Sequence, residues 1–464
     1  MSKLYVFGIG GTGSRVLRSF TMMLASGVKL GVKEVVPIVI DPDVSNADLT
    51  RSVSLMNNYR AIRSSLSFID SDTTMFFRTV LSQILPNYTL RIQDTDDKTF
   101  SQFIDLASMD KPTQAMMRML FSEKNLSSSM EVGFKGNPNI GSVVLNQIVN
   151  SNDFLNFANN FEAGDKIFII SSIFGGTGAS GFPLLLKTLR TGNSFPNNDL
   201  INNAEIGAIT ILPYFKLETN SESEIDSSTF ISKTKSALAY YENNISRNQS
   251  IDALYYLADD VTNTYENHEG GSPQKNDANL VEFLAATAIF DFCSKQHTPT
   301  VNKELGLHDL TDSVTFDSFY DNQKRMLFEP LTKFIMMSNC LGYKYNYYSS
   351  PSFNANNDHF KDIYNSSFMS ELQSMTRSYL EWLKELKNNK RSLNLFNLST
   401  ADKPFDVVSG YKPKKIFSTK SDYDLVTDRL NASVKRCRSR EDYNQFLEMF
   451  DLGLSKLIKE KFNI

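Results

Sequence analysis

The sequence predicts an α/β protein in which a parallel β-sheet carries helices on both faces. Short apolar runs of strand length alternate with segments whose apolar residues recur at helical spacing. The runs Leu4–Phe7 and Lys166–Ile173 each end at a glycine cluster, and a helical pattern follows each cluster directly. Buried runs that alternate with helices are typical of βα units, whose strands lie parallel in one sheet.

The expected elements follow in chain order. The apolar runs that we expect to be strands lie at residues 4–7, 35–40, 166–173, 206–212 and 253–257. Between residues 43 and 133 the chain is polar and favours helices without an obvious strand, so we expect a helical insertion at about residues 52–130. The run Phe283–Phe292 suits a helix buried between two domains. Residues 370–386, which include Trp382, and residues 423–462 return to helical spacing.

Composition excludes several classes of protein. The chain has 464 residues, 41% of them hydrophobic, which is enough for a sizeable core. Its 48 basic and 52 acidic side chains give a net charge of -4, which argues against a dedicated nucleic-acid binder. The three cysteines form no CxxC pair, so neither a disulfide framework nor a cysteine zinc site is expected. The start has no signal-peptide pattern and the apolar runs are too short to span a bilayer, so we expect a cytoplasmic protein without a transmembrane segment.

Two glycine segments, Gly8–Ser14 and Phe174–Gly181, each separate a strand pattern from a helix pattern. Glycines there allow a tight turn and let phosphate oxygens approach the N–H groups at the positive end of the helix. The first segment alone also fits the dinucleotide fingerprint, and no GxxxxGK[ST] motif occurs, which excludes a P-loop NTPase. Two such segments at one sheet edge would hold a polyphosphate from both sides. We therefore expect valine at Gly10 or Gly178 to block phosphate binding and leave the fold intact.

With a third segment, Gly133–Ser142, the chain resembles the tubulin/FtsZ superfamily of GTPases. That family has a GxGGxG loop after its first strand, a GAGANPxxG-like third loop and the signature GGGTG[ST]G after its fourth strand. The same motifs occur here in the same order, at residues 8–13, 133–141 and 174–181, although Phe174 replaces the first signature glycine. The resemblance covers roughly residues 1–312 and indicates a divergent, prokaryotic tubulin-like protein.

The resemblance implies a tubulin/FtsZ-like, Rossmann-type parallel sheet flanked by helices. It implies an N-terminal nucleotide-binding domain at residues 1–275, a long central helix at residues 276–298 and a second, α+β domain at residues 299–464. It also implies GTP or GDP and Mg²⁺ as ligands. The residues that it places around the nucleotide are Gly8, Gly10, Gly11, Thr12, Gly13, Asp41, Gly136, Asn137, Pro138, Asn139, Gly175, Gly176, Thr177, Gly178, Ala179, Ser180, Glu218, Asp259 and Asn279.

Several of these residues have distinct expected roles. Asp43, with Asp41 at the end of the second strand, is expected to hold Mg²⁺ through water, and the alternative is a turn cap. Glu218 resembles the ribose-binding glutamate of the fifth loop. Asp259 stands where the family usually has a guanine-contacting asparagine, and a carboxylate can also accept from guanine N1–H and N2–H. Asn279 matches the first turn of the central helix, which also contacts guanine.

In this family a loop after the central helix completes the neighbouring subunit's active site. Residues 306–312 match its Asp-x-x-Asp spacing through Asp309 and Asp312, but the preceding asparagine is missing. These acids would polarise the attacking water, and the alternative is that Asp312 caps a helix while Asp309 is solvated. The implied partner is a second copy of the chain, in a head-to-tail filament. A membrane or DNA adaptor protein is left open as a further partner.

Three other functions remain open at the level of sequence. The run Asp41–Asn46 with Arg51 resembles adenylyltransferases of the ubiquitin-activating/ThiF/MoeB kind, which lack a second strand–GGTGxxG–helix segment. A Rossmann oxidoreductase would need one glycine loop and not two. A nucleotide-binding scaffold of the same fold without hydrolysis would keep the glycine segments and lose the function of the post-helix loop.

Overall fold

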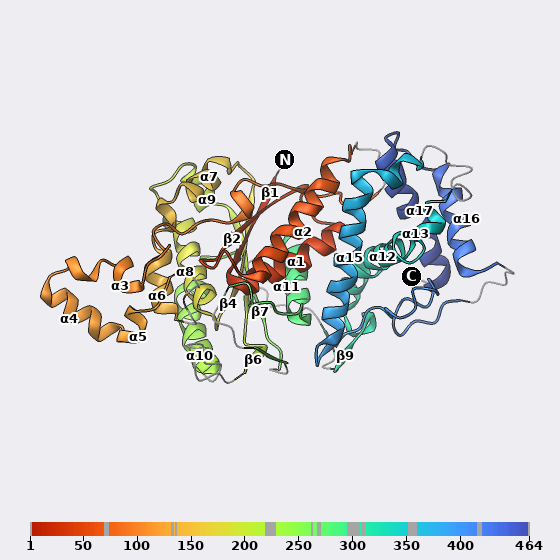
Figure 1. Ribbon diagram of the computed structural model, residues 1–464. Coiled ribbons are helices and arrows are strands. Elements are labelled where there is room, and N and C mark those ends of the chain that lie inside the picture. Colours follow the sequence, from red (N-terminus) through yellow and green to blue (C-terminus); the bar gives the residue numbers. More distant parts are fainter. Residues whose placement is uncertain are drawn as a thin grey trace.

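The centre of the protein is a six-stranded sheet in the order β3-β2-β1-β4-β5-β7, and all of its strands are parallel (Figure 1). The structure is a computed structural model that describes residues 2–68, 74–130, 134, 137–218, 229–260, 263–266, 271–294, 307–308, 311–350, 360–414 and 420–462. The strands are β1 (Lys3–Ile9), β2 (Glu34–Ile40), β3 (Val80–Leu81), β4 (Lys166–Ser172), β5 (Glu205–Ile211) and β7 (Ala253–Leu257). The predicted α/β class with a parallel sheet is confirmed.

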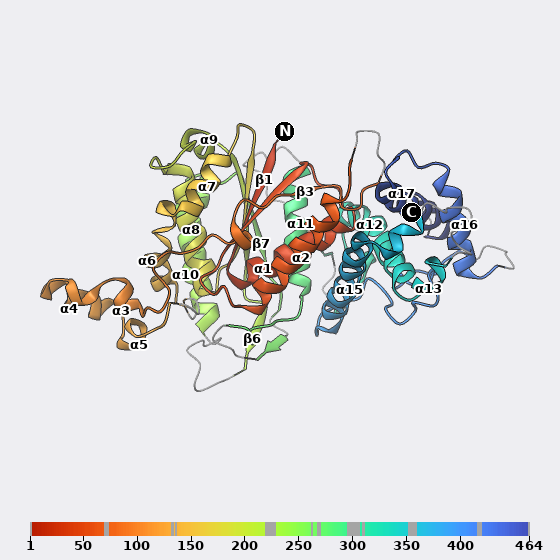
Figure 2. The same ribbon diagram turned by 45° about the horizontal axis from the view of Figure 1, so that its top comes forward.

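Helices cover both faces of this sheet (Figures 1 and 2). One face carries α1 (Gly10–Ala25), α2 (Ala47–Ser64) and α11 (Leu280–Ser294). The other carries α8 (Gly176–Thr191), with α6 (Pro138–Leu145), α7 (Asn152–Asn160), α9 (Asn198–Asn202) and α10 (Phe230–Tyr241) around it. Strands β1, β2, β4 and β5 are buried along nearly their whole length because they lie between two helix layers.

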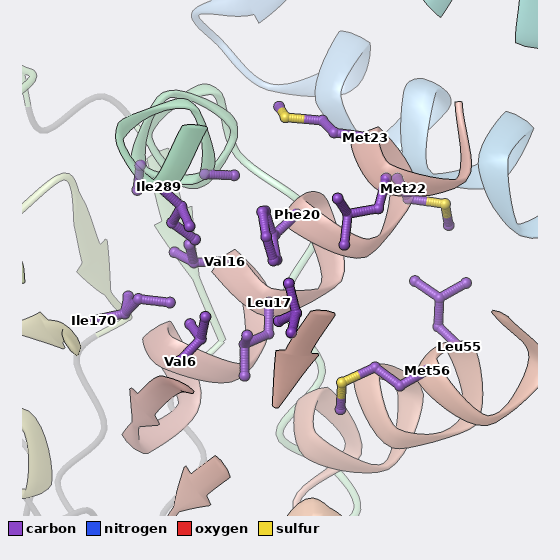
Figure 3. Packing of buried hydrophobic residues seen from close by; sticks show 14 of the residues in the cluster. Val6, Val16, Leu17, Phe20, Met22, Met23, Leu55, Met56, Ile170 and Ile289 are labelled. Atoms are coloured by element: carbon purple, nitrogen blue, oxygen red, sulfur yellow. The ribbon is translucent and has the colours of Figure 1, made fainter. Parts of the chain in front are cut away.

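Helix α1 is the most enclosed element of the first layer (Figure 3). Its Val16 and Phe20 lie toward Ile289 of α11, and its Leu17 lies close to the sheet. Helix α2 packs along another side of α1. Because α1 has neighbours on several sides, its buried residues include polar and charged side chains as well as apolar ones.

The part of the chain after α11 is mainly helical where it is described. Its helices are α12 (Asp321–Leu341), α13 (Tyr345–Tyr348), α15 (Ser367–Asn388), α16 (Asp422–Val434) and α17 (Asp442–Phe462). Its strands β9 (Ser313–Val314) and β10 (Ser392–Leu393) form a two-stranded parallel sheet, so there is less β-structure than an α+β domain suggested. The predicted helix around Trp382 is α15, and the Trp382 indole stacks on Phe283 of α11 and donates to Ser19 Oγ at 3.1 Å.

Two expectations need correction. The stretch before residue 133 contains β3, which pairs with β2, and it begins with α2, which belongs to the layer on the sheet. Only the short helices α3 (Phe100–Phe103), α4 (Lys111–Leu120) and α5 (Glu123–Leu126) extend away from the body (Figures 1 and 2). The second concerns the start of the central helix, since α11 begins at Leu280 and not at residue 276, while residues 295–298 of the expected helix lie outside the described residues.

The remaining elements are short. Strands β6 (Phe215–Leu217) and β8 (Asn263–Tyr265) pair in parallel beside the main sheet. Single helical turns lie at Pro86–Tyr88, Leu106–Ser108, Ile148–Asn150, Glu242–Ser246, Phe316–Ser318 and Asp362–Asn365. No helix within the described ranges is long and apolar enough to cross a membrane.

Candidate functional site

The strand order reverses direction between β1 and β4, and the first two glycine segments lie at this point. From β1 the chain proceeds to β2 and β3 on one side, and from β4 to β5 and β7 on the other. In open α/β sheets such a reversal leaves a crevice at the carboxyl ends of the two strands. A Cβ added to Gly10 would lie 3.5 Å from Thr177 Cβ and 3.9 Å from the Gly178 nitrogen, so the segments touch. The expected convergence of these two segments is therefore present.

The third segment reaches the same place through α6. Gly133, Lys135 and Gly136 lie outside the described residues, but Asn137, Pro138 and Asn139 are described and lead into α6. A Cβ added to Gly141 would overlap Ser180 Oγ, so α6 packs closely on the first turns of α8. A cavity of about 600 Å³ lies between α6, α8 and α10, and its lining includes Pro138, Asn139, Ala179 and Ser180.

The three helices that begin here lack side-chain caps. At α1, α6 and α8 the N-cap residues Ile9, Asn137 and Gly175 provide no side-chain cap hydrogen bond, and no acidic residue occupies the first turn. By contrast, Asn46 caps α2 and Ser151 caps α7. Uncapped helix N-termini carry unpaired N–H donors and a partial positive charge, and both favour an anion. Three of them around one crevice form a cradle suited to phosphate groups.

The glycines of this cradle have two different roles. Gly10 has a φ of +70°, a backbone conformation that favours glycine. Gly13 and Gly178 instead allow helices to approach strands, since an added Cβ would lie 2.5 Å from the Gly8 carbonyl carbon and 2.5 Å from the Ser172 carbonyl oxygen, respectively. The expectation that valine at Gly178 leaves the fold intact is therefore wrong, because the added carbons would meet strand backbone.

The two aspartates at the end of β2 are buried. Asp43 Oδ1 accepts from the Ser45 N–H and hydroxyl at 3.2 and 2.8 Å, and its Oδ2 accepts from the Gly271 N–H at 2.6 Å. Asp43 thus caps this turn, and its contact with magnesium through water stays a prediction. Within the described ranges no group of three or more acidic, histidine or cysteine side chains could hold a metal. Burial raises the pKa of Asp41 to about 7, and the nearby charges of Asp43 and Asp48 add to the effect.

Beneath the cradle, the buried guanidinium of Arg15 joins three other parts of the chain and also contacts Thr12 of its own helix. Its Nε donates to Glu282 of α11 at 2.5 Å and its Nη1 to Asp48 of α2 at 2.8 Å. Its Nη2 donates to the Tyr214 hydroxyl at 2.9 Å and to Thr12 Oγ1 at 3.3 Å. Burial alone would lower the pKa of Arg15, but Tyr214, Glu282 and Asp48 outweigh it and raise the pKa well above its ordinary value.

This ion network continues into α15. Glu385 accepts from Arg18 at 2.5 and 3.1 Å and from Arg51 at 3.1 Å, and Arg51 also pairs with Asp48 at 2.7 Å. The sequence prediction missed the network. Its only signal was the presence of charged residues inside otherwise apolar helices.

The residues predicted at the base end of the nucleotide have partners in the C-terminal part of the chain. Asn279 Oδ1 accepts from the Val281 N–H at 2.9 Å, and its Nδ2 donates to Asn389 Oδ1 at 3.3 Å. Asp259 forms an ion pair with Arg391 at 3.2 Å. Glu218 is exposed, and its backbone N–H pairs with the Tyr265 carbonyl. Sequence reasoning placed Asp259 and Asn279 near the base and missed both Asn389 and Arg391.

Asp312 lies close to these same residues. It is exposed, and its backbone carbonyl accepts from the Ser392 N–H at 2.8 Å, one residue from Arg391. Asp312 is therefore near the candidate base residues of its own chain. Asp309 lies outside the described residues. The role of both acids in a neighbouring subunit stays a prediction.

Comparisons with known proteins add little detail. No family model matches the chain, and no curated protein matches it. Among solved structures, one similar chain is CetZ2 from Haloferax volcanii in a GTPγS-bound protofilament, with 15% identity and a TM-score of 0.29. The match covers 55% of this chain and 49% of that one, so about half of either is compared. The fold is therefore judged from the strand order and helix layers. These show a parallel six-stranded sheet with helices on both faces.

The glycine geometry predicts unequal effects of alanine. Gly13→Ala and Gly178→Ala should each lower stability by about 1–3 kcal/mol, because the new Cβ meets strand backbone. Gly11→Ala is the matched control: its Cβ would make ordinary contacts at 3.5 and 3.8 Å, and it should be neutral or slightly stabilising. Thermal and urea unfolding of the three variants measure this. Equal stability of all three would contradict the assigned packing.

The Arg15 network predicts a large loss of stability on its disruption. Arg15→Met should cost about 3–5 kcal/mol, because Glu282 and Asp48 would remain buried without their cation. Arg118→Met removes one arginine from an exposed ion pair with Glu123 and should cost at most about 1 kcal/mol. Urea unfolding compares the two, and similar losses would show that the buried network contributes no more than a surface pair.

Proposed function

We propose that the protein binds GTP or GDP together with Mg²⁺ at the crevice between β1 and β4, and that it hydrolyses GTP. The observation that supports this best is the convergence of three uncapped helix N-termini at one strand reversal. Backbone N–H groups of the first turns of α1 and α8 would hold the phosphates from two sides. Magnesium would neutralise the β- and γ-phosphates, and Asp43 would contact it through water.

The distance across the sheet from β1 to β7 also suits the length of a nucleotide. Asp259 follows β7, which is separated from β1 by β4 and β5. At the usual spacing of about 4.8 Å between strands, β1 and β7 lie roughly 14 Å apart, which suits phosphates at one end and a base at the other. Glu218, next to β6, would lie on the ribose side. This arrangement supports a nucleotide that crosses the carboxyl edge of the sheet.

The residues that resemble an adenylyltransferase have structural partners here. Asn46 accepts from the Asp48 N–H and donates to Gln274, and Arg51 pairs with Asp48 and Glu385. These contacts give Asn46 and Arg51 structural roles that require no ATP site. Preferential binding of ATP in the test below would instead favour an adenylyltransferase.

For assembly, we propose a head-to-tail filament of identical subunits in which Asp309 and Asp312 act in hydrolysis. Support comes from the match to the family's post-helix loop spacing. A heterologous contact that does not close on itself builds a filament. A nucleotide-binding scaffold without hydrolysis is the alternative if the acids prove inactive.

Nucleotide binding is tested by a charge placed in the cradle. Thr177→Asp puts a carboxylate in the first turn of α8, where it repels phosphate while favouring the helix itself. We expect GTP and GDP affinity to fall at least tenfold, in isothermal titration calorimetry, with the melting temperature unchanged or raised. Asn322→Asp adds the same charge to the first turn of α12 and should leave affinity unchanged. Unchanged affinity in both variants would reject the cradle, and preferential binding of ATP with pyrophosphate exchange would favour the adenylyltransferase.

Assembly is tested by the concentration dependence of phosphate release. If one subunit completes the site of the next, the specific hydrolysis rate should rise with protein concentration. Asp309→Ala and Asp312→Ala should keep nucleotide binding and lose turnover, and electron microscopy with GTP should show filaments that persist longer. A constant specific rate, unaffected by either substitution, would indicate that each subunit hydrolyses GTP alone.

A further inference from the structure

Arg391 is a buried arginine held beside the candidate base residues. The residue is 6% exposed, and it lies between α15 and β10 in the chain. On one side of it, Asn389 accepts hydrogen bonds from Asn263 and Asn279. On the other, the Ser392 N–H donates to the Asp312 carbonyl. The backbone around Arg391 is thus fixed from both directions, which is the support that a precisely oriented side chain needs.

The guanidinium of Arg391 has donor capacity that the protein does not use. Its Nε lies 3.2 Å from Asp259 Oδ1, and its Nη2 donates to Asp260 Oδ2 at 3.4 Å. Its Nη1 is buried and has no hydrogen-bond partner among the residues that the structure describes. An arginine carries five N–H donors, and a buried donor without an acceptor is costly. A bound ligand that supplies an acceptor would account for this unpaired group.

We propose that Arg391 recognises the base of the bound nucleotide by donating to O6 and N7 of guanine. The inference rests on the proposed GTP site and adds to it a residue from the C-terminal part of the chain. Arginine binds this pair of acceptors in a bidentate manner, which is its commonest specific contact with guanine in nucleic-acid recognition. Asp259, held by the same arginine, accepts from N1–H and N2–H. Adenine presents an amino group in place of O6, so the pair selects guanine.

The position of Arg391 favours the base over the phosphates as its target. Arg391 contacts Asp259 and Asp260, which follow β7 at the edge of the sheet. The phosphate cradle lies at β1 and β4, with β5 between it and β7. Two carboxylates beside the guanidinium also offset much of the positive charge that a phosphate would require, while they leave a donor for a neutral acceptor.

The test compares GTP with 7-deaza-GTP, which lacks the N7 acceptor, by isothermal titration calorimetry on the full chain. The wild-type protein should bind 7-deaza-GTP roughly fivefold or more weakly than GTP. Arg391→Met should weaken GTP binding and bring the ratio of the two affinities to about one. Arg391→Lys keeps the charge and loses the planar pair of donors, so it should give an intermediate ratio of the two affinities. This variant keeps the test valid if Arg391→Met does not fold.

A matched arginine separates recognition from structural support. Arg190 forms an ion pair with Asp252 at the opposite end of the strands and donates to the Ala204 carbonyl. Arg190→Met should lower stability and leave the ratio of GTP to 7-deaza-GTP affinity as in the wild type. Equal binding of the two nucleotides by the wild type would overturn the inference while GTP binding stands. The inference would also be overturned if the Arg391 variants keep the wild-type ratio of GTP to 7-deaza-GTP affinity. Binding of neither nucleotide would overturn the proposed function as well.

Discussion

The buried charge of Arg15 is the constraint on which the arrangement of this protein depends. A guanidinium inside a protein is tolerated only when carboxylates and hydroxyls satisfy it. Here Glu282, Asp48 and Tyr214 do so, and they come from α11, α2 and the turn between β5 and β6. Because α1 begins directly at the first glycine segment, fixing Arg15 also fixes the N–H groups of the candidate phosphate cradle.

The same ions connect the cradle to the C-terminal helices. Asp48 holds both Arg15 and Arg51, and Glu385 of α15 holds Arg51 and Arg18. Helix α15 then ends at Asn388, and the next residue, Asn389, contacts Ala278 and Asn279 directly before α11. The ion network and the end of α15 therefore place the phosphate end and the base end of the candidate site in one connected set of contacts. Helix α15, which the sequence resemblance did not cover, is part of that set.

The glycine motif serves packing and binding at once. Gly10 provides a backbone conformation that L-residues rarely adopt, and the uncapped turns beside it leave donors for an anion. Gly13 and Gly178 have no Cβ because strand backbone occupies that space. A motif match alone cannot separate these roles, since both require the absence of a side chain. The two roles are distinguished only by what lies where the side chain of each glycine would be.

Periodicity in the sequence determined β1, β2, β4, β5 and β7, the helices after the glycine segments, and the helix around Trp382, because burial on a regular element leaves a local pattern. The two-residue strand β3 has no such pattern, since its conformation depends on pairing with β2 residues that lie 46 positions earlier in the chain. The glycine, Asn137–Asn139 and aspartate positions of the candidate site were visible as motifs. The Arg15–Glu282 pair and the Arg391–Asp259 pair were not, because they join residues 267 and 132 positions apart. Such contacts follow from how the layers pack, and only the tertiary structure decides them.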